Sequence, residues 1–123
     1  MEKTILIVDD NADTRLILSA RLKAHHYHTV FAADALQAMS VAQKERPDAI
    51  LLDLGLPGGN GLMVLDRLKS NTSLRCIPVI IVTAEDPQVA EAGALNGGAV
   101  AFLRKPVDQD KLIATVQQAL GTP

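Results

Sequence analysis

The chain has 123 residues and a formal net charge of −2, so we expect a single domain over residues 1–123, without the basic surface that nucleic-acid binding requires. Hydrophobic residues make up 48% of the chain and aromatic residues only 2%, which predicts an aliphatic core of the kind found in parallel sheets covered by helices. With a single cysteine, no leader-like N-terminal pattern and no apolar run long enough to cross a bilayer, the protein is expected to be cytoplasmic and to have no membrane partner.

Short apolar runs rich in β-branched residues alternate along the chain with segments of helical spacing. The first run, at 4–8, predicts a strand, and Leu16, Leu18 and Leu22 mark the helix that follows it. The later strands are predicted at 28–32, 49–53, 77–82 and 99–103. Each pair of neighbouring strands is therefore separated by one predicted helix.

The later helices have start and stop signals of their own. Pro47 ends the second helix, and the Gly97-Gly98 pair ends the fourth. The last helix begins after Asp108, a residue type that caps helix N-termini, and runs to about Leu120. The third helix follows Asn60 and is marked by apolar residues at helical spacing, namely Leu62, Leu65 and Leu68.

Strict alternation of strands and helices predicts a doubly wound (βα)5 sandwich of the α/β class. Its parallel sheet is covered by helices on both faces, and the crossovers are right-handed. In such sheets, ligands bind outside the carboxyl ends of the strands, near the point where the strand order reverses. The functional residues are therefore sought at that edge.

Five polar residues follow or end these predicted strands: Asp9, Asp10, Asp53, Thr83 and Lys105. Three carboxylates in one partly buried site would raise each other's pKa unless a cation intervenes, and one lysine cannot balance three negative charges. A divalent metal is the expected counter-ion. Ligands that are all oxygen suit Mg²⁺ better than zinc, which prefers nitrogen or sulfur.

A metal held by few protein carboxylates commonly takes phosphate as a further ligand, which indicates phosphoryl chemistry. Asp53 is the best candidate nucleophile, because it lies at the end of the central strand and a carboxylate there could attack phosphorus. Lys105 and Thr83 would then bind the phosphoryl oxygens.

Four motifs occur in an order and spacing that resemble the receiver domains of two-component response regulators. They are VDD at 8–10, LLDLGLPGGNG at 51–61, VTA at 82–84 and LRKP at 103–106. Together they cover essentially the whole chain. The resemblance implies a flavodoxin-like sheet of strand order 2-1-3-4-5, with a cis Lys105-Pro106 bond that aims the lysine inward.

The resemblance also implies a role for each site residue. Asp53 would accept a phosphoryl group from a sensor histidine kinase or a phosphotransfer protein. Asp9, Asp10, Asp53 and the backbone carbonyl of Gly55 would hold Mg²⁺, for which Mn²⁺ is a substitute, while Thr83 and Lys105 would contact the phosphoryl group.

Phe102 would be the aromatic residue of a switch that also involves Thr83. This switch would change the surface of the fourth helix, fifth strand and fifth helix, which an effector protein or a fused output domain would read. Such a domain is a signalling phosphoacceptor rather than an enzyme, although it catalyses its own phosphorylation and slow dephosphorylation.

Other interpretations of the same residues remain open at this point. The Asp9-Asp10 pair could simply cap the following helix, and Phe102 could be an ordinary core residue. The histidines at positions 25, 26 and 28 lie at the edge opposite the aspartates, which favours a solvated turn over a metal site. Cys76 is expected to be an inert thiol. GGNG at 58–61 lacks the phosphate-loop pattern and is interpreted as a flexible turn.

Two other functions fit the same sheet. A Mg²⁺-dependent phosphatase with an aspartate nucleophile would place a second acid two positions after it, where this chain has Gly55. A flavin-binding module would need aromatic side chains against the ring, and the chain has very few.

Overall fold

The computed structural model describes residues 2–57 and 60–121. Its strands are β1 (Thr4–Val8), β2 (His28–Ala32), β3 (Ala49–Leu52), β4 (Val79–Thr83) and β5 (Ala101–Arg104). Its helices are α1 (Ala12–Ala24), α2 (Ala35–Glu45), α3 (Gly61–Ser70), α4 (Pro87–Asn96) and α5 (Gln109–Ala119). None of these helices is long and apolar enough to cross a membrane.

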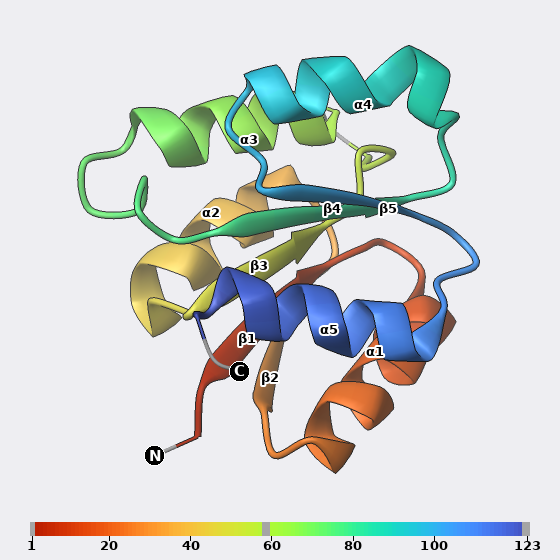
Figure 1. The fold of residues 1–123 in the computed structure, drawn as a ribbon. Helices are drawn as coiled ribbons and strands as arrows, with labels where there is room; N and C mark the ends of the chain where they lie inside the picture. The colour runs from red at the N-terminus through yellow and green to blue at the C-terminus, as the bar shows by residue number, and fades with distance from the viewer. Residues whose placement is uncertain (1, 58–59, 122–123) are drawn as a thin grey trace.

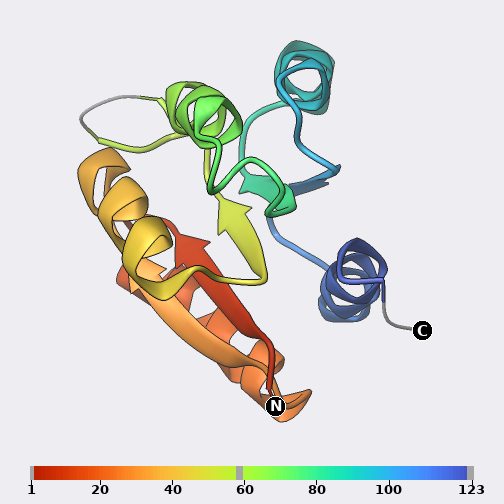
Figure 2. The same ribbon diagram turned by 90° about the vertical axis from the view of Figure 1, so that its left-hand side faces the viewer.

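The strands form one parallel sheet of order β2-β1-β3-β4-β5. Figure 1 shows the helices in two layers, with α1 and α5 on one face of the sheet and α2, α3 and α4 on the other. The view in Figure 2 shows the sheet between the two layers. The predicted fold class and strand order are confirmed.

Each face of the sheet has its own aliphatic core. Ile5, Ile7 and Leu51 pack against α1 and α5, whereas Leu6 and Leu52 pack against α2, α3 and α4. Neighbouring positions on a strand point to opposite faces, so strands covered on both sides are apolar throughout. This explains the continuous apolar runs in the sequence.

Helix α1 differs in one respect from its predicted pattern. Leu18 and Leu22 are buried, but Leu16 is 70% exposed. Leu18 and Leu22 are about one turn apart, so they lie on the same side of the helix. Leu16 is only two residues from Leu18, so it points to a different side. The prediction that Leu16 belongs to the apolar side of the helix was wrong.

The helices begin at the residues that cap them. In each described helix, the side-chain oxygen of the capping residue accepts a hydrogen bond from a backbone N–H of the first turn. The capping residues are Asn11, Asp34, Asn60, Asp86 and Asp108. The predicted cap at Asp108 is confirmed. Because Asn11 caps α1, the Asp9-Asp10 pair is available for another role.

The ends of two helices also agree with the sequence. Helix α2 ends before Arg46, which adopts a left-handed conformation just ahead of Pro47. Helix α4 ends at Asn96, and Gly98 has a φ of 107°, which a side chain would disfavour. The part of the predicted GGNG turn at 58–59 lies outside the described residues.

Strand β4 begins two residues later than predicted. The expected run started at residue 77, but the ladder begins at Val79, because Pro78 has no N–H to donate. The carbonyl of Pro78 still accepts a hydrogen bond from Ile50, at 3.0 Å. The strand then ends at Thr83, which keeps that residue at the carboxyl edge.

Gly61, the first residue of α3, is in close contact with the chain that follows β3. Its N–H donates to the carbonyl of Leu54 at 2.8 Å. A Cβ atom at this position would lie 2.4 Å from the carbonyl oxygen of Asp53 and 2.6 Å from the Cα of Leu54. Because both neighbours are backbone atoms, only glycine fits here without moving the chain.

Candidate metal and phosphoacceptor site

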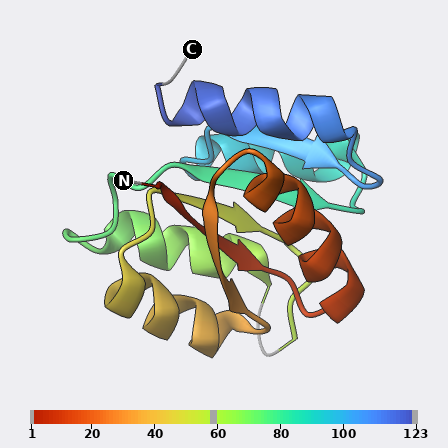
Figure 3. The same ribbon diagram turned by 90° about the horizontal axis from the view of Figure 1, so that it is seen from below.

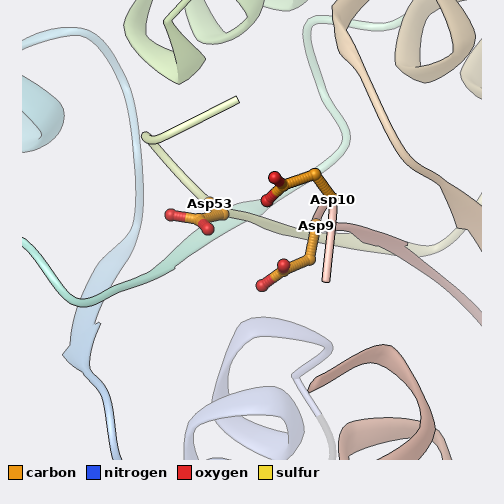
Figure 4. A group of neighbouring side chains, drawn as sticks. All are labelled: Asp9, Asp10 and Asp53. Carbon is orange, nitrogen blue, oxygen red and sulfur yellow. The ribbon is translucent and has the colours of Figure 1, made fainter. Parts of the chain in front are cut away.

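The carboxyl ends of β1 and β3 bring three carboxylates together, as expected for neighbouring parallel strands. Asp9 and Asp10 follow β1, and Asp53 follows β3. Carboxylate oxygens of the three residues lie within 4.8 Å of one another. Figure 4 shows the three side chains gathered at this edge, and Figure 3 shows the strand arrows running toward it.

Among the described residues, this is the one group of three or more acidic, histidine or cysteine side chains spaced to hold a metal ion. His25 and His26 follow the end of α1, and His28 begins β2, at the opposite end of the strands from Asp9. The predicted separation of the histidines from the aspartates is therefore confirmed.

The Lys105 ammonium joins two of the three carboxylates. Its Nζ donates to Asp9 Oδ2 at 2.6 Å and to Asp53 Oδ2 at 3.1 Å. The Lys105-Pro106 bond is cis, as the family resemblance implied. Lys105 is thus at the site where the sequence predicted it, and it supplies one positive charge against three carboxylates.

Asp9 and Asp53 are held at both carboxylate oxygens. Asp9 Oδ1 accepts a hydrogen bond from the Asn11 N–H at 2.9 Å, and Asp53 Oδ1 accepts one from the Gly55 N–H at 3.1 Å. Both aspartates are buried, whereas Asp10 is exposed. The Asp10 carboxylate has no hydrogen-bond or ion-pair partner among the described residues, which leaves both of its oxygens able to bind a cation.

The donors at this edge fit Mg²⁺. All three side chains offer oxygen, the ligand type that Mg²⁺ prefers, and one of them, Asp10, is exposed and has no partner within residues 2–57 and 60–121. Lys105 leaves two of the three negative charges uncompensated, so a divalent cation would complete the charge balance. The acidic triad could therefore hold Mg²⁺.

The Lys105 pKa reflects two opposing influences. Burial lowers it, but the hydrogen bonds to Asp9 and Asp53 and their negative charges together outweigh burial, so the pKa is raised above its usual 10.5. A raised pKa in the folded state means that the ion pairs contribute stability that is fully present below the unfolded pKa. That contribution is lost as the pH rises through the higher folded pKa.

The pH dependence of Lys105→Met should report these ion pairs. Without Mg²⁺, the wild type should have the larger free energy of unfolding, and its advantage over the variant should shrink once the pH rises past 10.5. Urea unfolding in EDTA across this range measures the difference. Lys111→Met, which removes an exposed lysine of α5, controls for the loss of one positive charge. An advantage that grows at alkaline pH would contradict the assignment.

Thr83 and Phe102 lie on the neighbouring strands β4 and β5. Thr83 ends β4 and is buried, and its hydroxyl accepts a long hydrogen bond, 3.4 Å, from the Glu85 N–H. Phe102 is partly buried on β5 and packs against the core on the side of α4. The carbonyl of Thr83 accepts the backbone N–H of Lys105 at 2.8 Å, which joins the ends of β4 and β5.

Two further residues contribute to the site without belonging to a motif that the sequence revealed. Asn11 caps α1 and donates its N–H to Asp9. The Arg15 guanidinium donates to the backbone carbonyl of Asp9 at 2.7 Å. Asn11 could have been recognised as a capping residue type at a helix start, whereas nothing in the sequence indicated that Arg15 turns back toward Asp9.

The chain belongs to the response regulator receiver domain family, whose model matches residues 5–117. It is 36% identical over 121 residues to the polar-differentiation response regulator DivK of Brucella anthropi, covering 98% of each chain. It is 38% identical over 117 residues to the response regulator PleD of Caulobacter vibrioides. That match covers 95% of this chain but only 26% of PleD.

Solved structures of receiver domains are also similar to this chain. The receiver domain of the sensor histidine kinase PA1611 from Pseudomonas aeruginosa, described with a magnesium ion coordinated in its active site cleft, has a TM-score of 0.90. It is 30% identical, and the match covers 99% of this chain and 100% of that one. As a member of this family, the protein is a phosphoacceptor of two-component signalling with an acidic pocket, rather than a classical enzyme.

Proposed function

We propose that Asp53 accepts a phosphoryl group from a histidine kinase or a phosphotransfer protein in a reaction that requires Mg²⁺. The observation that carries the proposal is the position of the Asp53 carboxylate. It lies beside two further carboxylates that can share a cation with it, and it is 3.1 Å from the ammonium of Lys105.

In the proposed reaction, a carboxylate oxygen of Asp53 attacks the phosphorus atom of a phosphohistidine. The new O–P bond forms while the P–N bond breaks, and the electron pair of that bond stays with the imidazole nitrogen. Lys105 would offer its ammonium to a phosphoryl oxygen, and Thr83 its hydroxyl, which stabilises the charge that spreads over these oxygens. Mg²⁺, when bound, would supply further positive charge for the phosphoryl oxygens.

The residues that would hold Mg²⁺ are Asp9, Asp10 and Asp53, with the backbone carbonyl of Gly55 as a further ligand and Mn²⁺ as a substitute ion. The magnesium in the PA1611 receiver domain, at 30% identity, supports this choice of ion. The Gly55 N–H already bonds Asp53, which supports a position for residue 55 next to the cluster.

Incubation with a small acyl phosphate tests the function directly. The protein should gain one phosphoryl group, measured by intact mass, in the presence of Mg²⁺ or Mn²⁺, and none when EDTA removes the metal. A gain that is equal with and without metal would refute the Mg²⁺ requirement, and no gain under any condition would refute the phosphoacceptor itself.

We further propose that Thr83 and Phe102 transmit the phosphorylation signal. In the phosphorylated state, the Thr83 hydroxyl would be drawn to a phosphoryl oxygen, and Phe102 would turn further inward. The face formed by α4, β5 and α5 would change as a result. The weak bond at 3.4 Å from Glu85 to the Thr83 hydroxyl supports this, because little is lost when the hydroxyl moves.

Amide NMR with beryllofluoride, a stand-in for the phosphoryl group, tests this switch. We expect the wild type to show large shifts between residues 84 and 104. Thr83→Ala should still bind beryllofluoride at Asp53 but show smaller shifts in that range, and Phe102→Ala should lose the response of the same face. Equal shifts in all three proteins would return Phe102 to the role of a core residue.

The partners follow from the proposed transfer. A histidine kinase or phosphotransfer protein would supply the phosphoryl group in the cytoplasm, and an effector protein or a fused output domain would read the altered face. We expect no direct nucleic-acid or membrane partner for residues 1–123, which we propose to be a single receiver domain.

A further inference from the structure

Both backbone polar groups of Asp9 form hydrogen bonds, and Arg15 donates one of them. The Asp9 N–H donates to the Ala32 carbonyl at 3.0 Å, and the Asp9 carbonyl accepts the Arg15 guanidinium at 2.7 Å. Arg15 lies on the first turns of α1, six residues along the chain from Asp9. Although three carboxylates lie close by, this guanidinium forms no ion pair with any described carboxylate.

The Asp9 carbonyl belongs to the peptide group that joins Asp9 to Asp10. A peptide group is planar, so fixing its carbonyl oxygen also fixes the direction of the Asp10 N–Cα bond. The Asp10 side chain has no partner of its own among the described residues, so its direction depends on this backbone. A charged donor makes a shorter and stronger bond to the carbonyl than a neutral one would.

We propose that Arg15 is a positioning residue that sets the direction of the Asp10 carboxylate for cation binding, by holding the Asp9-Asp10 peptide plane. It does not touch the cation. It would act only through its bond to the Asp9 carbonyl, while Asn11 and Lys105 hold the Asp9 carboxylate. This inference rests on the proposed Mg²⁺ site and adds a residue to it.

Mg²⁺ affinity of purified variants, measured by isothermal titration calorimetry, tests the role without any phosphorylation. Arg15→Met keeps the length of the side chain and removes its donors, and we expect the dissociation constant to rise by about 10-fold or more, as for other residues that orient metal ligands. Arg15→Lys, which retains one charged donor, should recover part of the lost affinity.

Arg21→Met is the matched control. Arg21 is also on α1, and its guanidinium is bonded to Asp110 of α5 at 2.9 Å rather than to a residue of the triad. We expect this variant to keep the wild-type Mg²⁺ affinity even if it lowers the melting temperature. Equal losses of affinity in Arg15→Met and Arg21→Met would overturn the proposal, as would unchanged affinity in Arg15→Met.

A spectroscopic measurement separates the bond from a general effect of charge or stability. The carbonyl ¹³C resonance of Asp9 and the amide resonance of Asp10 should shift in metal-free Arg15→Met, and Arg15→Lys should restore part of the shift. If Arg15→Met does not fold, the wild type gives the answer. The Arg15 guanidinium and Asp9 carbonyl resonances should then move together on Mg²⁺ addition, and their remaining unmoved would overturn the proposal.

The two levels of inference fail in different ways. If the wild type itself does not bind Mg²⁺, the proposed metal site is wrong. If the wild type binds Mg²⁺ and Arg15→Met binds it equally well, the metal site stands and the role of Arg15 is wrong.

Discussion

Asp53→Asn is expected to reduce phosphorylation by a small acyl phosphate to the background level. The amide keeps the shape of the side chain but has neither the negative charge nor the nucleophilic oxygen that the attack on phosphorus requires. Asp53 is buried and anchored by Gly55 and Lys105, and asparagine can keep the bond from Gly55 through its own oxygen. The fold should therefore survive while the reaction is lost.

Intact mass with Mg²⁺ present measures the loss, and Asp66→Asn provides the control. Asp66 is an exposed aspartate of α3, and its replacement removes the same charge from the surface. We expect this variant to be labelled like the wild type. Labelling of Asp53→Asn at the normal rate would show that another residue is the acceptor.

Addition of Mg²⁺ is expected to stabilise the protein, and Asp10→Asn should remove much of this gain. A ligand that binds only the folded state stabilises it by about 2.7 kcal/mol when present at about 100 times its dissociation constant. For a domain of this size, that corresponds to a rise in melting temperature of roughly 10 °C. Without metal, Asp10→Asn should leave stability unchanged or slightly higher, because it removes one charge from an acidic cluster.

Asp9→Asn should behave differently from Asp10→Asn. The Asp9 carboxylate is buried and bonded to Asn11 and Lys105, so replacing it should lower the metal-free melting temperature and also weaken the response to Mg²⁺. Melting curves in MgCl₂ and in NaCl of equal ionic strength separate binding from screening. A wild-type melting temperature that does not respond to millimolar Mg²⁺ would count against the site.

The fold could be predicted largely because the sequence separates strands from helices clearly. In β1 and β4, the apolar residues 5–8 and 79–82 are buried on both faces of the sheet, and a polar residue follows each of these runs. The parallel arrangement then places the polar residues that follow them at a single edge. The sequence alone therefore predicts that Asp9, Asp10 and Asp53 lie close together, as they do in the structure.

The bonds within the site could not be predicted in the same way. Whether Lys105 reaches Asp9, Asp53 or both depends on the path of the chain through a cis peptide and on side-chain rotamers. The bond from Arg15 to the Asp9 carbonyl depends on how α1 turns away from β1. Such contacts join residues that share no periodic pattern. Every residue has a backbone carbonyl, so the sequence does not show which carbonyl accepts a side-chain hydrogen bond.

The close contact at Gly61 has a mechanical consequence. Where a side chain separates two segments, they can slide by changing rotamers, but here the start of α3 touches the backbone of Asp53 and Leu54 directly. Displacement of the backbone of Asp53, the proposed phosphoacceptor, would therefore be expected to move the start of α3 as well. On the β4 side, the carbonyl of Thr83 is held by Lys105 at 2.8 Å, but its hydroxyl holds the Glu85 N–H only through a bond of 3.4 Å. If phosphorylation displaces this edge, we therefore expect α3 to move together with Asp53, and the Thr83 hydroxyl and the chain after it to move more independently.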